Sequence, residues 1–287
     1  MPTHLHIDPF SGIAGDMFLG GLIDLGLELK QLEKHLAPLP VERAYRLRAT
    51  RVQRHGIGAV DFRVEIEGEP HPHHHHETCH EEAGGEHEHS HGHAHDHDHE
   101  HDHEHGHEHG HHHHHHHTGY REIMAMIDQL DISEPGRERA RRVVTKLGEA
   151  EARVHGKSLE EIHFHEVGAV DSIVDMLGSV VGLELLGIET LSCGPLPVSR
   201  GFVRCEHGLM PVPAPATAYL LRGLPTVGVD RRGELITPTG AALVAGLCGS
   251  FGPPPTMVMQ EIGYGAGDRE DPEVPNLLRL MLGRTGE

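Results

Sequence analysis

Apolar and polar residues alternate in three short stretches, and this period of two predicts β-strands. The first, at residues 3–8, leads directly into a turn that contains two glycines. The other two, at 45–52 and 60–66, lie on either side of His55 and Gly56. We therefore expect an N-terminal strand, followed later by an antiparallel hairpin with one face toward solvent.

Apolar residues recur at helical spacing in several longer stretches. Residues 169–186 are the most apolar of them, so we expect this helix to pack on a sheet. Beyond Thr190 the chain changes to short apolar runs separated by Gly and Pro. Helices are expected at 17–25, 28–36, 120–130, 134–154, 169–186, 216–221 and 239–248. The irregular alternation of helices and strands predicts an α+β fold with a mixed sheet and packed helices, and it leaves the strand order open.

A histidine-rich segment at 71–117 interrupts this pattern. It holds 25 of the chain's 33 His and 11 Asp or Glu, without Lys or Arg. Imidazole suits nickel, copper and zinc, and the interleaved carboxylates attract cations. We expect a long disordered metal-binding insert that divides an α+β core into residues 1–70 and 118–287. The candidate ligands of this insert are His97, His99, His101 and His103. The alternative is that the segment is a solvated linker with incidental metal affinity.

The composition narrows the classes of function. The formal net charge is −20 and no basic patch is present, so nucleic-acid binding is not expected. No apolar stretch is long enough to cross a bilayer, and residues 1–10 do not have the pattern of a signal peptide. The four Cys lie far apart without a CxxC pair. These features predict a cytoplasmic protein in a reducing environment.

The richest candidate site spans residues 162–175. His163 and His165 are two apart, so an extended segment would present both to one metal ion. Asp171 and Asp175 are four apart on the helix expected next, which places both on one stripe as possible ligands. Glu166 is placed to act as a further ligand or a general base. The alternative is that one His caps a helix and the acids are solvated.

A second candidate is the turn between the first strand and the first helix. Gly12 and Gly15 resemble a loop whose backbone N–H groups receive a phosphate at a helix N-terminus. The turn lacks the P-loop lysine, so a plain strand-to-helix turn explains it equally well. Asp8 and Asp16 at its ends are alternative ligands for a cation.

A third candidate combines a thiol, an imidazole and an anion site. Cys205 and His207 are two residues apart, a pairing that suits soft or borderline metals, although a lone Cys is more often a small buried apolar residue. Arg200 is placed to hold an anionic ligand, and Thr239 lies at the start of a helix that could face the same anion.

Three segments together resemble the nickel insertase of nickel-pincer cofactor biosynthesis, the LarC family. They are residues 10–17, residues 163–173, and residues 201–215 with 237–241. The resemblance covers nearly the whole chain outside the histidine-rich segment, and such a loop of variable length is a family feature. It implies that Ni(II) is inserted into pyridinium-3,5-bisthiocarboxylic acid mononucleotide, with CTP and a divalent cation, to give the cofactor of lactate racemase-type enzymes.

Nickel then ends bound to two sulfurs and a ring carbon, so a ring proton must leave. Glu166, His163 and His165 are our candidates for the general base and the transient ligands. Family members continue into a C-terminal domain, which is absent here, so a C-terminal partner polypeptide is expected along with a cofactor-receiving apoenzyme. A non-enzymatic nickel store is the main alternative, and a zinc-dependent hydrolase ranks below it because no HExxH-type motif is present.

Overall fold

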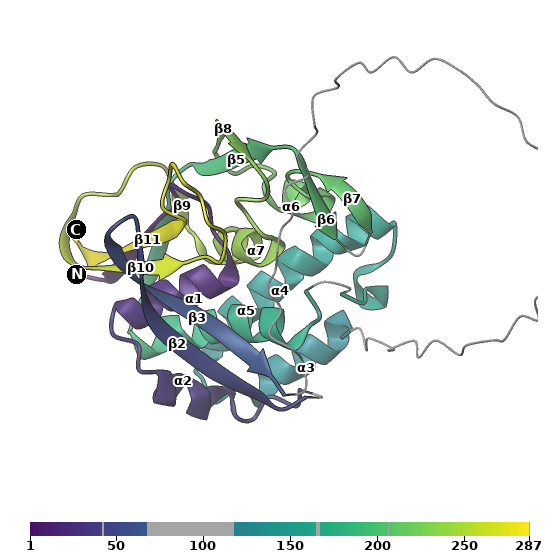
Figure 1. Ribbon diagram of the computed structural model, residues 1–287. Helices are drawn as coiled ribbons and strands as arrows, with labels where there is room; N and C mark the ends of the chain where they lie inside the picture. Colours follow the sequence, from purple (N-terminus) through teal and green to yellow (C-terminus); the bar gives the residue numbers. More distant parts are fainter. Residues whose placement is uncertain (42, 68–117, 165–166, 206, 287) are drawn as a thin grey trace, which may run out of the picture. The chain divides into compact units, whose positions relative to one another are not determined.

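A mixed seven-stranded sheet forms the centre of the computed structural model, which describes residues 1–41, 43–67, 118–164, 167–205 and 207–286 (Figure 1). The strand order is β2-β3-β10-β11-β1-β4-β9. Its strands are β1 (Thr3–Asp8), β2 (Tyr45–Arg54), β3 (Ile57–Ile66), β4 (Thr190–Cys193), β9 (Ser250–Phe251), β10 (Met257–Ala266) and β11 (Leu277–Thr285). The predicted α+β class with a mixed sheet is confirmed.

The N-terminal strand β1 lies inside the sheet. It pairs antiparallel with β11, where Leu5 faces Leu282, and parallel with β4. The predicted hairpin is β2 and β3, which pair antiparallel over their full length and turn at His55 and Gly56, both with positive φ. The C-terminal strands β10 and β11 join the hairpin to β1, because β10 pairs parallel with β3 and antiparallel with β11.

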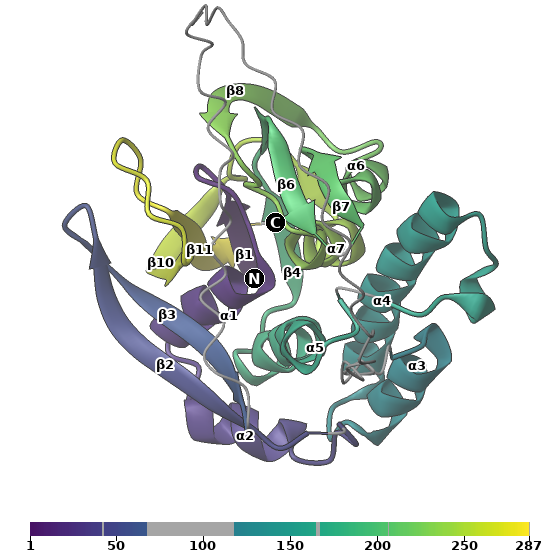
Figure 2. The same ribbon diagram turned by 45° about the vertical axis from the view of Figure 1, so that its right-hand side comes forward.

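Helices cover this sheet and each other. Helix α1 packs on β3, β10 and β11, and α5 packs on α1 and β3, as expected for the most apolar helix. Figure 2 shows α5 between α1 and α4. The helices are α1 (Gly15–Asp24), α2 (Leu29–Leu36), α3 (Tyr120–Gln129), α4 (Glu134–His155), α5 (Val170–Leu185), α6 (Pro215–Leu220) and α7 (Pro238–Leu247), with a short 3₁₀ turn at Leu159–Glu161. The predicted helices thus lie close to their predicted positions.

Glycines bring α1 unusually close to β10. A Cβ on Gly265 would overlap the carbonyl oxygen of Met17, and one on Gly263 would overlap that of Gly21. On the helix, Gly20 likewise lies against the carbonyl oxygen of Val60 in β3. Only residues without a Cβ permit this backbone-to-backbone approach. The first turn of α1 is therefore held at a fixed depth against the sheet.

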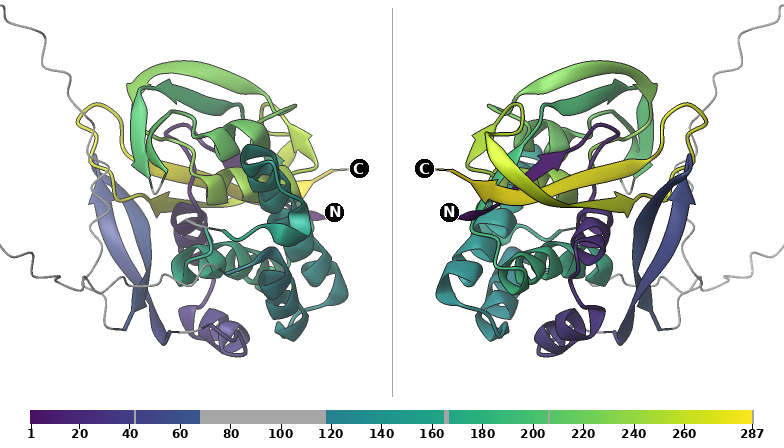
Figure 3. Two further views of the ribbon diagram at one scale, coloured as in Figure 1. Left: turned by 90° about the vertical axis from the view of Figure 1, so that its right-hand side faces the viewer. Right: turned by 90° about the vertical axis from the view of Figure 1, so that its left-hand side faces the viewer.

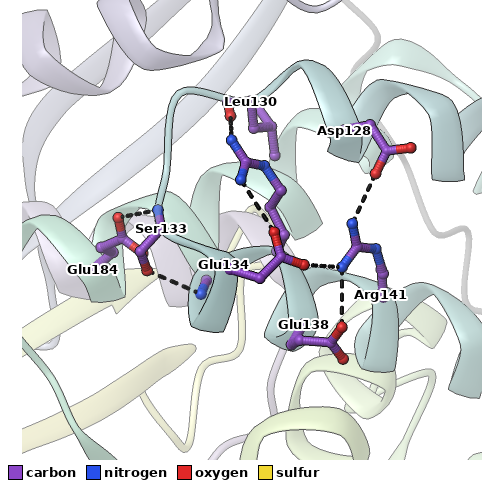
Figure 4. A network of polar contacts seen from close by, with 9 residues as sticks. Asp128, Leu130, Ser133, Glu134, Glu138, Arg141 and Glu184 are labelled. Carbon is purple, nitrogen blue, oxygen red and sulfur yellow. Dashed lines mark hydrogen bonds and ion pairs between the residues drawn. The ribbon is translucent and has the colours of Figure 1, made fainter.

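The start of α4 is held by a polar network (Figure 4). The Ser133 hydroxyl caps the helix by accepting from the N–H of Gly136 at 3.2 Å, and it donates to Glu184 of α5 at 2.6 Å. Arg141 binds Asp128, at the end of α3, at 2.8 Å and Glu134 at 2.6 Å. Capping and these ion pairs tie α3, α4 and α5 together.

Two small sheets complete the described chain. They are a parallel pair, β5 (Leu196–Arg200) with β8 (Thr226–Arg232), and a hairpin, β6 (Phe202–Cys205) with β7 (Gly208–Pro211). In both views of Figure 3 their green strands are drawn above the yellow strands β10 and β11, and helices α1 to α3 are drawn below.

The expected histidine-rich insert, including the four histidines singled out above, lies outside the described residues. Within the part that the structure describes, no helix has the length and apolar character to cross a membrane. Among the described residues, Cys193, Cys205 and Cys248 form no disulfide bond.

Candidate functional site

The loop between β1 and α1 is clamped to a distant segment of the chain. The N–H of Ile13 donates to the carbonyl of Leu235 at 2.8 Å, and the N–H of Thr237 donates to the carbonyl of Ile13 at 3.1 Å. Gly12 has a φ of 120°, and a Cβ there would overlap the carbonyl oxygen of Leu235. This position therefore requires glycine for both conformation and space.

The N-termini of α1 and α7 meet at this loop. Thr237 caps α7 by accepting from the N–H of Gly240 at 3.2 Å. Thr239, in the first turn of α7, accepts from the N–H of Gly15 at 3.3 Å and lies 2.9 Å from the Thr237 hydroxyl. The backbone N–H of Gly15 is therefore already bound by protein.

Two carboxylates lie together at the head of α1. A Cβ on Gly15 would be 2.7 Å from Cβ of Asp175, so the α5 side chain packs directly on the first residue of α1. Asp175 accepts a hydrogen bond from the backbone N–H of Asp16. Burial, which has the largest effect, and the nearby charges of Asp268 and Asp61 together raise the pKa of Asp16 to about 7. Burial, then Asp16 and Asp171, raise the pKa of Asp175 as well.

More acids surround this pair. Arg63 of β3 binds Asp61 at 3.0 Å and Asp268, in the β10–β11 loop, at 2.5 Å. Asp171 stands in the first turn of α5, where it accepts from the N–H of Ser172 at 2.7 Å. We call Asp16, Asp61, Asp171, Asp175 and Asp268 the acidic cluster. With one arginine among five carboxylates, it is suited to attract a cation.

The opposite side of the loop carries arginines. Arg231, near the end of β8, donates to the hydroxyl of Ser11 at 3.1 Å and pairs with Asp271 at 2.6 Å. The pKa of Asp271 falls to about 2, because two backbone N–H groups and Arg231 outweigh the effect of its burial. No local motif in the sequence marks these residues, nor Asp61, Arg63 and Asp268, because they come from loops and strands far apart in the chain.

Other predicted residues lie elsewhere. Asp8 is paired with Arg279 of β11, whose guanidinium lies over the ring of Phe10. His163 is exposed and forms a β-bridge with Gly119. His165 and Glu166 lie outside the described residues.

The third predicted group does not join the acidic cluster. Arg200 is exposed and paired with Asp230 of β8. Cys205 ends β6, and the exposed ring of His207 has its centroid 5.2 Å from that of His155, at the end of α4. Thr239, the other residue of the predicted anion site, lies at the head of α1, where its hydroxyl accepts from the N–H of Gly15.

Metal ligation requires convergence in space, not only suitable residue types. Among the described ranges, no three His, Cys, Asp or Glu side chains are arranged to hold a metal ion. The acidic cluster therefore supplies charge and a close carboxylate pair, rather than a complete coordination shell.

Fold and site together define an α+β protein that concentrates carboxylates where its first helix meets the sheet. The chain belongs to the nickel insertion protein family, whose model matches residues 5–287. No solved structure matches it.

Curated relatives support the same membership. A protein from Geobacter sp. strain M21, named "Putative nickel insertion protein", is 41% identical over 282 residues, which is 98% of this chain and 62% of that protein. A protein of the same name from Citrifermentans bemidjiense is 42% identical over 282 residues, with the same coverage. Another from Wolinella succinogenes is 42% identical over 278 residues, 97% of this chain and 59% of that one. The chain thus spans about three fifths of the length of these relatives.

Proposed function

We propose that this chain is the part of a nickel insertase that inserts Ni(II) into pyridinium-3,5-bisthiocarboxylic acid mononucleotide. The reaction consumes CTP with a divalent cation and yields the nickel-pincer cofactor for a lactate racemase-type apoenzyme. Family membership over residues 5–287 supports this proposal, together with the resemblance of residues 10–17 and 163–173. A C-terminal partner polypeptide is part of the proposal, and the chain covers 62% of the length of the Geobacter relative.

The contact between the two segments that carry the resemblance assigns the proposed function to specific residues. The two segments with the strongest resemblance are about 150 residues apart in the chain, yet Asp175, just beyond one, packs on Gly15 and bonds to Asp16 in the other. Burial is the main cause that raises the pKa of both carboxyl groups, and the charge of Asp16 raises that of Asp175 further. A divalent cation between the two carboxylates removes the repulsion between their charges.

Asp16 and Asp175 are thus the proposed first ligands of incoming Ni(II). Carboxylate oxygen is a hard ligand that holds nickel less firmly than sulfur does. Nickel therefore transfers readily from the carboxylates to the two thiocarboxylate sulfurs of the substrate. The nickel–carbon bond then forms as the ring C–H bond breaks, and its proton passes to a base.

Glu166 is the proposed base, with His163 and His165 as transient ligands. Replacing Glu166 by Gln is expected to spare nickel binding and to stop insertion, because the amide keeps the shape but cannot accept the proton. Full insertion activity in that variant would remove Glu166 from the mechanism and leave the carboxylate pair to be tested as the base.

The decisive experiment mixes the purified chain with Ni(II), the bisthiocarboxylate mononucleotide and CTP, with and without a C-terminal partner. The product is followed by mass spectrometry. Product from the chain alone would make these 287 residues a sufficient insertase. Product only with the partner would establish a split enzyme. Tight nickel uptake without product in either arm would contradict the proposal and favour a nickel store. Deletion of residues 71–117 is a second test, and loss of all function at high nickel in that variant would also favour a store.

A further inference from the structure

Two arginines from different segments lie beside the loop between β1 and α1. Arg231 of β8 donates through Nη1 to the hydroxyl of Ser11 at 3.1 Å. Arg269, in the loop between β10 and β11, donates through Nη1 to the carbonyl of Arg232 at 3.2 Å. Both side chains are partly buried, and the charge of Arg231 is near enough to lower the pKa of Arg269. Two guanidinium groups are thus held together at the edge of the site.

One carboxylate, Asp271, pairs with Arg231 and its charge also acts on Arg269, and both of its oxygens accept hydrogen bonds. Asp271 receives Nη2 of Arg231 on Oδ2 at 2.6 Å. Its other oxygen, Oδ1, accepts from the N–H groups of Glu273 at 2.9 Å and Val274 at 3.0 Å. The acid therefore shapes the loop and balances Arg231. One positive charge remains, and it belongs to Arg269.

Arg269 makes no ion pair within the described ranges, and its one bond there is to a neutral carbonyl. Burial and the charge of Arg231 lower the pKa of Arg269, so the fold holds this cation where its charge is unfavourable. A purely structural role would need one of the five guanidinium N–H donors. The remaining donors suit an oxyanion that accepts several hydrogen bonds at once.

We propose that Arg231 and Arg269 form a binding site for a phosphomonoester, with Arg231 held in place by the buried hydroxyl of Ser11. This site does not use the N-terminus of α1, since the N–H groups of Gly15 and Asp16 are bound by Thr239 and Asp175. Phosphate oxygens accept the fork of a guanidinium in bidentate fashion, and two adjacent arginines match a dianion.

The identity of the ligand rests on the proposed function. Neighbouring residues in one loop serve opposite charges: Asp268 belongs to the acidic cluster, and Arg269 belongs to the arginine pair. A pyridinium mononucleotide has the same polarity, with a cationic ring at one end and a phosphate at the other. The arginine pair is thus the site for the 5′-phosphate of the substrate, and the acidic cluster receives the ring and nickel.

The test measures binding without nickel and without turnover. Isothermal titration calorimetry compares nicotinic acid mononucleotide with nicotinic acid riboside, which lacks the phosphate, on the full chain. We expect the mononucleotide to bind at least roughly tenfold more tightly, as a charge-assisted hydrogen-bond pair warrants. Arg269→Gln is expected to abolish that difference, and Arg269→Lys to reduce it. The matched control is Arg46→Gln, on the exposed edge strand β2, which removes the same charge and should change neither affinity.

A measurement on the unaltered chain guards against a variant that fails to fold. Inorganic phosphate is expected to compete with the mononucleotide, while sodium chloride of equal ionic strength is expected to compete much less. Equal affinities for mononucleotide and riboside, or unchanged binding in a folded Arg269→Gln variant, would overturn the phosphate site. Phosphate-dependent binding without nickel insertion would support the site and contradict the proposed function. Nickel insertion at full rate and with an unchanged KM in Arg269→Gln would contradict the phosphate site and support the proposed function.

Discussion

Two aspartates on opposite sides of one loop show how differently the fold treats the same side chain. Asp16 is buried beside other carboxylates, and its pKa rises to about 7. Asp271 lies between backbone N–H groups and Arg231, and its pKa falls to about 2. The first acid destabilises the folded chain at neutral pH and the second stabilises it. A site that retains an unfavourable charge is arranged for something other than stability, and cation binding is the role that we propose for it.

The largest effect is expected from adding a methyl group at the acidic side. In Gly15→Ala the new Cβ would lie 2.7 Å from Cβ and 2.9 Å from Oδ2 of Asp175, so the carboxylate pair must separate. We expect nickel insertion to fall by about a hundredfold or more, because displacement by 1 Å can cost that much. Gly58→Ala is the control, since nothing lies within 4 Å of its Cβ. Normal insertion by a folded Gly15→Ala chain would show that the pair is not part of the site.

The second prediction removes the stabilising acid. Its low pKa means that Asp271 contributes stability that is fully present above about pH 4 and is lost as the pH falls toward 2. Asp271→Asn is therefore expected to lower the free energy of unfolding by roughly 1–2 kcal/mol at pH 7, allowing for partial solvent exposure. Urea denaturation at pH 7 and pH 3 measures this, with the loss shrinking at the lower pH. Asp230→Asn, whose aspartate is 83% exposed, is the control and should change little.

The third prediction removes the destabilising acid, Asp16, and is expected to raise the stability of the chain. Because the folded pKa of Asp16 is raised, its charge costs stability fully above about pH 7 and not at all below about pH 4. Asp16→Asn keeps an oxygen for the N–H of Met17, which now donates to Oδ1 at 2.8 Å. We expect it to stabilise the chain by roughly 1–2 kcal/mol at pH 8, since the side chain retains some contact with solvent, and by almost nothing at pH 4.

Urea denaturation at these two pH values checks the sign. The same variant is expected to lose nickel insertion, so that stability and function change in opposite directions. A destabilised Asp16→Asn chain at pH 8 would mean that Asp16 has a stabilising partner and that the comparison with Asp271 fails.

The sequence predicted the local elements on both sides of this loop, but not their convergence. Alternation and helical spacing placed β1, the β2–β3 hairpin and all seven described helices near their observed positions, because those signals are local. It did not identify β10 and β11 as strands. Met257–Ala266 has glycines at 263 and 265, which lower strand propensity but are needed for the approach of α1.

The residues of the candidate site likewise fall into those that the sequence predicted and those that it did not. Asp16, Asp171 and Asp175 stood out because each lies in a compact motif that runs into a helix. Arg231 and Arg269 did not, since they meet only once β8 and the β10–β11 loop are placed beside β1. Residue types can be recognised in a sequence, whereas the pairing of distant loops depends on the strand order, which the pattern left open.

The smallest effect is expected away from this loop, at the β6–β7 hairpin. His207 was chosen by the same kind of reasoning as Asp16, yet it is exposed and its ring approaches that of His155 at a centroid distance of 5.2 Å. His207→Ala is expected to change the free energy of unfolding by no more than about 0.5 kcal/mol, as is usual for exposed positions. The rate of nickel insertion at saturating nickel should stay within about twofold of that of the unaltered chain, because the proposed nickel ligands are Asp16 and Asp175. A large loss of insertion that excess nickel restores would instead assign the hairpin a role in nickel uptake, and the acidic cluster would then not be the only entry point for the metal.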